Sequence, residues 1–278
     1  MTTMTQEAVS GKAHGPMFGR LLLAEWTKLR SVRSTYWSLI LLVLITFGFT
    51  ALFVGLTVSQ WDKSAKDNPD QMAQLVRDPA GFIFGAGIGF GQLTICVLGV
   101  LVITSEYSTG MIRSSLLAVP TRLPMLAAKC AVFAAVVFVI AELIAFPTFF
   151  LGSAMLHSKV QVSLSDPGVL RACLGVGLYL AMVGLFALAI GGIVRHTAGS
   201  ITGVIAFVLV IAPLAQLLPG KTGKYVHAYL PTEAGSLIGK AVQGKDDVLT
   251  PWQGYGVFAL WTVVLLAVAA YLLRRRDA

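Results

Sequence analysis

Histidines, cysteines and acids are the residues of this chain that could bind a metal or catalyse a reaction. The four histidines lie in four separate segments, and no two of them have the His-x-x-x-His spacing of a helical metal site: His14, His157, His196 and His227. No pair of acids on one apolar segment suggests a protease or a metal site. The sequence therefore predicts no catalytic constellation and no metal site.

The segment Gly220-Lys221-Thr222 is similar to the end of a phosphate-binding loop. That motif also needs a glycine five residues before Gly220, where Ala215 stands, and it needs a strand before it and a helix after it. We therefore expect an ordinary turn here. The chain is predicted to hold no nucleotide or other cofactor of its own.

Three cysteines lie in or beside apolar segments and are expected to serve as small packing residues: Cys96, Cys130 and Cys173. The formal net charge is +8, but no basic run is interleaved with aromatic residues. The sequence gives no sign of a nucleic-acid surface.

Composition points to the membrane. Hydrophobic residues make up 56% of the 278 residues and charged residues only 12%, and the mean hydropathy is +0.79. A typical soluble domain has about a quarter of its residues charged. The apolar residues also come in long uncharged runs, as membrane helices require. We predict an all-α membrane protein.

Residues 1–16 are polar and are expected to be disordered, and residues 17–278 are expected to form a single transmembrane domain. The first apolar run is too long and begins too late for a signal peptide. The predicted spans are 36–58, 81–104, 125–152, 171–194, 200–218 and 252–273. Three glycines of the second span have the spacing of four that allows close helix packing: Gly81, Gly85 and Gly89, with Gly87 and Gly91 offset by two.

The stretch before the first span has the pattern of a basic amphipathic helix. Leu22, Trp26 and Leu29 fall on one helical face, and Glu25 can pair with Lys28 one turn later. Such a helix could lie in the lipid headgroup layer or could simply extend the first span into the cytoplasm. We expect the interfacial helix.

Between the second and third spans, polar residues interrupt the apolar sequence from Thr104 to Lys129. A short amphipathic helix is predicted there, ending before Pro120, with an apolar face of Met111, Ile112, Leu116, Leu117 and Val119. Periodicity alone leaves open whether this helix binds a protein or floats on the membrane. Lys129 lies near the cytoplasmic start of the next span, where a lysine can extend to the headgroups.

Glu142 is the acid that lies deepest in a predicted span. An ionisable side chain in the bilayer normally faces water or the protein interior. Glu142 could bind a cation or proton, line a substrate path, or be protonated and hydrogen-bonded to a neighbouring helix.

We expect polar connections elsewhere: a loop from the first span to Pro79, and a surface helix between the fifth and sixth spans. That helix is predicted to begin at an N-cap Thr232 and to end at Gly244, with an apolar stripe of Ala234, Leu237, Ile238, Ala241 and Val242.

The distribution of basic residues predicts the orientation. With the N-terminus inside, the inner segments hold 12 of the 21 basic residues and only four acids, whereas the outer loops hold nine basic residues and eight acids. Both termini are therefore expected in the cytoplasm, and the surface helix outside.

Two segments resemble the bacterial ABC-2 type transporter permeases, especially actinobacterial ones. The first is Glu25 to Trp37, EWTKLRSVRSTYW. The second is Ser105 to Lys129, which contains Glu106-Tyr107, Gly110-Met111-Ile112-Arg113, Pro120 and Lys129 in corresponding places. The layout of six spans with two accessory helices also resembles that family.

The resemblance implies a permease subunit that forms a homodimer or heterodimer in the bacterial cell membrane and docks a separate cytoplasmic ATPase, which binds ATP and Mg²⁺. A coupling helix between spans two and three would contact that ATPase through Glu106, Tyr107, Gly110, Met111, Ile112, Arg113, Leu116 and Leu117. The interfacial helix would contribute Glu25, Trp26, Lys28 and Arg30.

ABC export is our leading hypothesis, and apolar spans favour a hydrophobic or amphipathic cargo such as a lipid, peptide or antibiotic. Two alternatives stay open. One is an ion-coupled secondary carrier with Glu142 as its proton or cation site, although we find no clear internal repeat of the kind such folds often have. The other is a membrane scaffold or sensor subunit that transports nothing.

Overall fold

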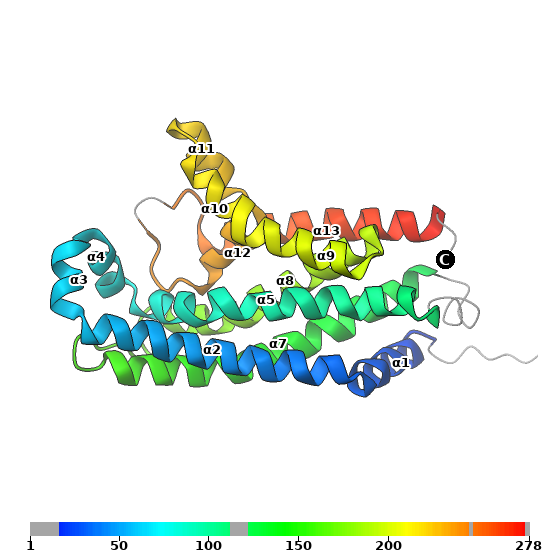
Figure 1. Ribbon diagram of the computed structural model, residues 1–278, viewed down its shortest axis with the longest axis horizontal. Helices are drawn as coiled ribbons and strands as arrows, with labels where there is room; N and C mark the ends of the chain where they lie inside the picture. The colour runs from blue at the N-terminus through cyan, green and yellow to red at the C-terminus, as the bar shows by residue number, and fades with distance from the viewer. Residues whose placement is uncertain (1–16, 112–121, 245–246, 276–278) are drawn as a thin grey trace, which may run out of the picture.

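The computed structural model describes residues 17–111, 122–244 and 247–275, and these residues form helices and no strands (Figure 1). Six helical segments among them are long and apolar enough to cross a membrane. They are α2 (Arg33–Ser59), α5 (Pro79–Ser108), α7 (Arg122–Leu156), α8 (Val169–Val194), a composite fifth span and α13 (Pro251–Arg275). The prediction of an all-helical protein with six spans is confirmed.

The fifth span changes its helical pitch part-way. It begins as α9 (Thr197–Ala206), passes through the π-turn η1 (Phe207–Ile211) and continues as α10 (Ala212–Leu214) and the 3-10 turn η2 (Ala215–Leu217). The Ala212 N–H donates to the Phe207 carbonyl, five residues back. Pro213 comes next and has no N–H to continue the regular ladder, which accounts for the irregular turn.

One short helix precedes the first span, and further short helices and a 3-10 turn connect later spans. They are α1 (Met17–Ser31), α3 (Trp61–Asp67), α4 (Pro69–Arg77), α11 (Gly220–Ala228), α12 (Pro231–Ser236) and the 3-10 turn η3 (Leu237–Gly239). The polar loop predicted after the first span is wrong, because that stretch forms α3 and α4. Met72 and Leu75 of α4 are buried, so this helical pair packs onto the bundle.

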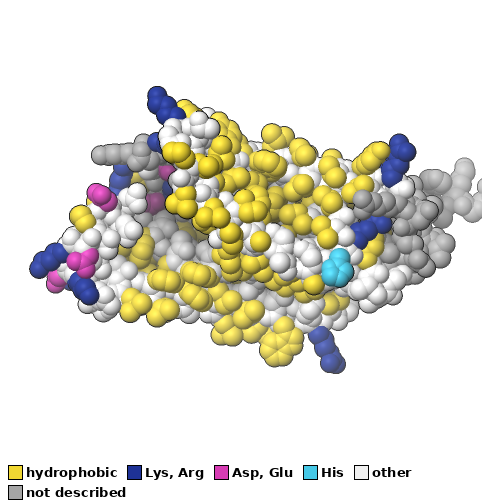
Figure 2. Space-filling model, turned by 45° about the horizontal axis from the view of Figure 1, so that its top comes forward, with side chains coloured by type: hydrophobic (Ala, Val, Ile, Leu, Met, Phe, Trp, Pro, Cys, Tyr) yellow, Lys and Arg dark blue, Asp and Glu magenta, His cyan; other side chains and the backbone are white. Residues whose placement is uncertain are grey.

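Helices α5 and α8 form the centre of the bundle. In the apolar windows of these two helices 56% and 72% of the residues are buried, against 22–28% in the other spans. Figure 2 shows hydrophobic side chains covering the middle of one face, with charged side chains towards the ends. The outer helices therefore present apolar surface where a bilayer would surround the protein.

Of the glycines that the sequence pointed to in α5, the offset pair Gly87 and Gly91 permits close packing within this chain. A side chain at Gly87 or Gly91 would collide with Thr50 or Thr46 of α2. By contrast, Gly85 and Gly89 have no neighbouring atom within 4 Å in the described part of the chain. The offset pair serves the helix contact within this chain, because a helix buries only the residues on the side that faces its neighbour.

The surface helix predicted between the last two spans differs from the structure. Helix α12 begins with Pro231 in its first turn, Thr232 is not its N-cap, and the helix ends at Ser236 instead of Gly244. Most of α12 and η3 is buried, and both pack against α8 and α13. Arg171 of α8 fixes η3 and the residues after it by donating to three backbone carbonyls, those of Ile238, Lys240 and Ala241.

The close contact between α5 and α8 provides a test of the fold. A side chain at Gly99 would collide with the carbonyl oxygen of Gly184, which is backbone and cannot move aside. We expect Gly99→Ala to reduce the free energy of unfolding by about 1–3 kcal/mol, the usual cost of overpacking. Gly85→Ala, in the same helix, has open space and should stabilise the protein by about 0.5–1 kcal/mol. Denaturant unfolding in detergent measures both, and equal effects would contradict the packing.

Candidate functional site

Helix α1 lies against the bundle with an acidic residue on its buried face. Leu21, Glu25 and Leu29 follow one another at a spacing of four, and all three are buried. The face expected from the sequence is split, because Leu29 is buried whereas Trp26 is 46% exposed. Glu25 therefore points into the protein, where a carboxylate needs a partner of opposite charge.

Two further charged side chains reach the same place from the long helices. Glu106 lies in the last turn of α5, and Lys129 lies two turns into α7. Their residues are only 3% and 4% exposed. Lys129 does not extend to the headgroups, as the sequence suggested, because its ammonium group turns inward and binds both acids.

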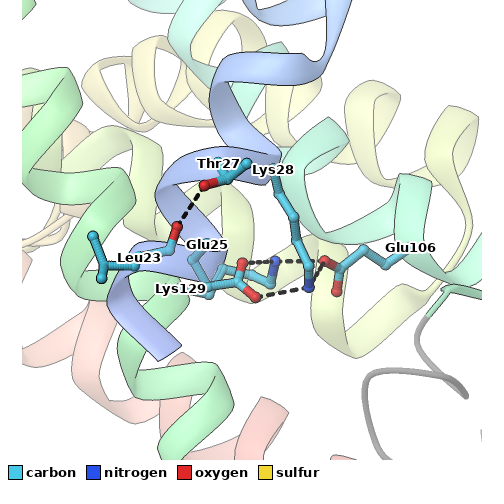
Figure 3. A network of polar contacts seen from close by, with 6 residues as sticks. All are labelled: Leu23, Glu25, Thr27, Lys28, Glu106 and Lys129. Carbon is cyan, nitrogen blue, oxygen red and sulfur yellow. Dashed lines mark hydrogen bonds and ion pairs between the residues drawn. The ribbon is translucent and has the colours of Figure 1, made fainter. Parts of the chain in front are cut away.

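Four side chains close a ring of alternating charge (Figure 3). The Lys129 ammonium lies 2.6 Å from Glu25 Oε2 and 2.8 Å from Glu106 Oε1. The Lys28 ammonium lies 2.8 Å from Glu25 Oε1 and 3.0 Å from Glu106 Oε1. The predicted pairing of Glu25 with Lys28 is confirmed, and it is one side of this larger ring.

The ring is neutral and largely shielded from solvent. The side chains of Glu25, Glu106 and Lys129 are 4–6% exposed, and Lys28 is the most accessible member at 28%. Burial on its own lowers the pKa of Lys28, but the hydrogen bonds to Glu25 and Glu106 outweigh it and hold the pKa above its ordinary value. Lys28 therefore remains charged, and each carboxylate keeps two cationic neighbours.

This ring joins three parts of the chain. Lys28 and Glu25 belong to α1, Glu106 to the end of α5, and Lys129 to the start of α7. Glu106 and Lys129 are separated by 23 residues, and their ion pair brings together the two ends of the segment between α5 and α7. The ring thus fixes the two described ends of the chain that flank that segment.

Part of the predicted coupling helix is described. After Tyr107, helix α5 ends at Ser108, and Gly110 adopts a positive φ of 69°. That left-handed conformation suits glycine and turns the chain away from the helix. Met111 follows and is 41% exposed. The other predicted coupling residues lie outside the described residues: Ile112, Arg113, Leu116 and Leu117.

Glu142 lies far from the ring, about 20 Å further along α7 at 1.5 Å per residue. Its carboxyl group faces Gly177 of α8, where a side chain would collide with it. Neither of its oxygens has a hydrogen-bond partner among the described residues. In the described part of the chain Glu142 therefore has no cationic partner, and its carboxyl group lies against the backbone of Gly177.

The ring as a whole was not found from the sequence, although two signals pointed to it. Glu25 shares a helical face with two leucines that become buried. Lys129 lies within an apolar run, where a charge needs a partner. Sequence spacing could not show that these two residues, 104 positions apart, meet each other.

Comparison with models of protein families gives a match. The model of a family described as "ABC-2 family transporter protein" matches residues 21–213. The matched region contains all four residues of the ring, and it ends within the fifth span. A search of the curated proteins finds no match.

The ring predicts a specific pattern of stabilities. We expect Lys129→Met to reduce the free energy of unfolding by about 3–5 kcal/mol, because Glu25 and Glu106 would share Lys28 alone. Glu106→Gln combined with Lys129→Met should cost less, because it leaves the intact pair of Glu25 and Lys28. The control Lys63→Ala alters an exposed lysine of α3 and should stay within about 0.5 kcal/mol. Denaturant unfolding in detergent measures the free energy of unfolding of all three variants. A loss below about 1 kcal/mol for Lys129→Met would exclude the ring.

Proposed function

This chain belongs to the ABC-2 family of transporters and is a membrane-spanning ABC transporter subunit, and we propose that it exports its substrate using ATP hydrolysed by a separate ATPase. The ring of Glu25, Lys28, Glu106 and Lys129 is the observation that carries this proposal. It ties the base of the segment between α5 and α7 to α1. A force applied to that segment therefore reaches three helices together.

We place the ring at the cytoplasmic side of a bacterial cell membrane, with both termini on that side. The net positive charge of the predicted inner segments supports this orientation. Figure 1 shows α1 and the end of α13 at one end of the bundle and α3 and α4 at the other. In Figure 2 acidic and basic side chains gather together at the end that we assign to the outside.

The proposed docking surface runs from Glu106 to Val119. Within it, Glu106 is buried in the ring, so its role is to anchor the surface and not to contact the ATPase. Met111 is exposed, and it begins the apolar face predicted from the sequence. The ATPase would bind ATP and Mg²⁺, and its closure on ATP would push or pull the segment held by the ring.

The cargo that we propose is hydrophobic or amphipathic, such as a lipid, a peptide or an antibiotic. Its support is the scarcity of charge in the spans between their ends, where Glu142 stands alone among apolar and small residues. Two such permease subunits, alike or different, would assemble side by side in the lipid. The apolar outer faces of α2 and α13 provide surface for that assembly and for lipid contact.

Arg113 provides the test of ATPase docking. We expect Arg113→Glu to leave membrane insertion intact but to reduce co-purification of the ATPase and ATP-driven transport at least about tenfold, because a lost charged contact costs about 2–5 kcal/mol. Arg77→Glu is the matched control, since Arg77 is exposed on α4 at the opposite end of the bundle. Normal ATPase binding and transport by Arg113→Glu would refute the docking surface.

Glu142 separates ATP-driven export from ion-coupled transport. Because no cation pairs with its carboxyl group in the described residues, we expect Glu142→Gln to keep both stability and ATP-driven flux near those of the unaltered protein. The measurement is substrate flux in reconstituted vesicles with ATP, and again with an ion gradient and no ATP. Flux that persists without ATP and disappears in Glu142→Gln would identify a secondary carrier. A complete absence of flux under both conditions would favour a scaffold or sensor subunit.

A further inference from the structure

Next to Glu106, the aromatic ring of Tyr107 contacts a different part of the molecule. The guanidinium carbon of Arg195 lies 4.9 Å from the centre of the Tyr107 ring, within the range of a cation–π interaction. Tyr107 and Glu106 are consecutive residues in the last turn of α5. The helix end that is tied to α1 and α7 through Glu106 is therefore also tied to Arg195 through Tyr107.

Arg195 stands at the junction of two spans. It ends α8 and is followed by His196, whose ring nitrogen accepts a hydrogen bond from the Gly199 N–H and caps α9. The guanidinium group also donates to the carbonyl oxygen of Leu272, near the end of α13, at 3.1 Å. One side chain thus contacts α5 and α13 from the turn between α8 and α9.

The backbone of Arg195 indicates that this position is demanding. Its φ of 58° lies in the left-handed region, and it is the only non-glycine residue with positive φ in the described part of the chain. Glycine usually takes that conformation at the end of a helix because it has no side chain to crowd the backbone. The arginine at this position has a strained backbone, and its side chain makes the contacts with Tyr107 and Leu272 that a glycine could not make.

The simplest reading of Arg195 is a helix cap, in which a basic residue favours the C-terminal end of α8. That role needs only a charge near the helix end. A cap does not account for a guanidinium group placed over the aromatic ring of Tyr107. That residue follows Glu106 of the charged ring and precedes Gly110 by three positions.

We propose that Arg195 is a positioning residue that transmits movement of the end of α5 to α9 and α13. The inference rests on the proposed function, in which an ATPase moves the segment beyond α5. Glu106 would carry that movement to α1 and α7, and Arg195 would carry it through Tyr107 to the later half of the bundle. The two consecutive residues together reach both halves of the chain.

Spin labels at the two helix ends test the contact in the full-length chain, in lipid nanodiscs and without a partner. Ser108→Cys on α5 and Ala198→Cys on α9 offer exposed labelling sites, after the three native cysteines have been replaced by alanine. Distances between the labels are measured by pulsed electron paramagnetic resonance. With Arg195 present we expect a narrow distribution.

Arg195→Gly suits the left-handed backbone and removes only the side chain, so it should fold. We expect it to broaden the distribution at least about twofold. Tyr107→Leu should broaden the distribution as well, whereas Tyr107→Phe should not, because it keeps the aromatic ring. The double variant, Arg195→Gly with Tyr107→Leu, should show a distribution no broader than that of either single variant. A narrow distribution in Arg195→Gly, or additive broadening in the double variant, overturns the proposal. Tyr107→Leu against Tyr107→Phe decides the question if Arg195→Gly does not fold.

The complex with the ATPase separates this inference from the proposed function. A reference label at Lys66→Cys on α3 allows the shifts of α5 and α9 to be followed after addition of ATP and vanadate. We expect both helices to shift in the unaltered protein, and the α9 shift to fall by at least half in Arg195→Gly while the α5 shift remains. An undiminished α9 shift overturns the role of Arg195 alone. No shift of α5 in the unaltered complex overturns the proposed function, and the inference falls with it.

Discussion

The cost of burying charge governs the architecture of this protein at one end of its bundle. Burying a carboxylate or an ammonium group without a partner of opposite charge costs on the order of several kcal/mol of folding free energy. The two acids and two lysines of the ring avoid that cost only when α1, α5 and α7 come together in one arrangement. A hydrophobic contact would tolerate small slips between helices. A ring of four alternating charges does not, because each displaced group takes one of two partners from each of its two neighbours.

In the middle of the bundle, close packing of α5 against α2 and α8 also holds α5 in place. At Gly99 the backbone of α5 approaches the backbone of α8 at Gly184, and at Gly87 and Gly91 it approaches the threonine side chains of α2. Such contacts depend on shape, since apolar side chains gain little from leaving lipid. Helix α5 is thus held by steric fit along its length and by electrostatic pairing at its end. It is well placed to act as a rigid lever for the segment that follows it.

Composition and periodicity predicted the six spans because each span is a local property of about 20 residues. They also predicted the pairing of Glu25 with Lys28, which are one turn apart. The errors arose where the answer depends on tertiary contacts. Lys129 was expected at the lipid headgroups, because the sequence does not show that Glu25 and Glu106 lie beside it in the fold. Helix α12 was expected to be longer because its apolar stripe continues beyond Ser236. Instead the chain passes into the 3-10 turn η3 and then leaves the helical path, and Arg171 donates to carbonyls of this stretch.

The positions of the ring residues along the chain also determine when, during synthesis, the ring can form. Synthesis delivers Glu25 and Lys28 first, Glu106 second and Lys129 last. Until the third span emerges, two carboxylates share one lysine, and α1 has no complete partner set on the bundle. The N-terminal helix can therefore reach its final place only after more than a hundred later residues have been synthesised. A chain that stops short of Lys129 has two acids of the ring but only one of its lysines, so the charge balance of this site is completed only when the third span is made.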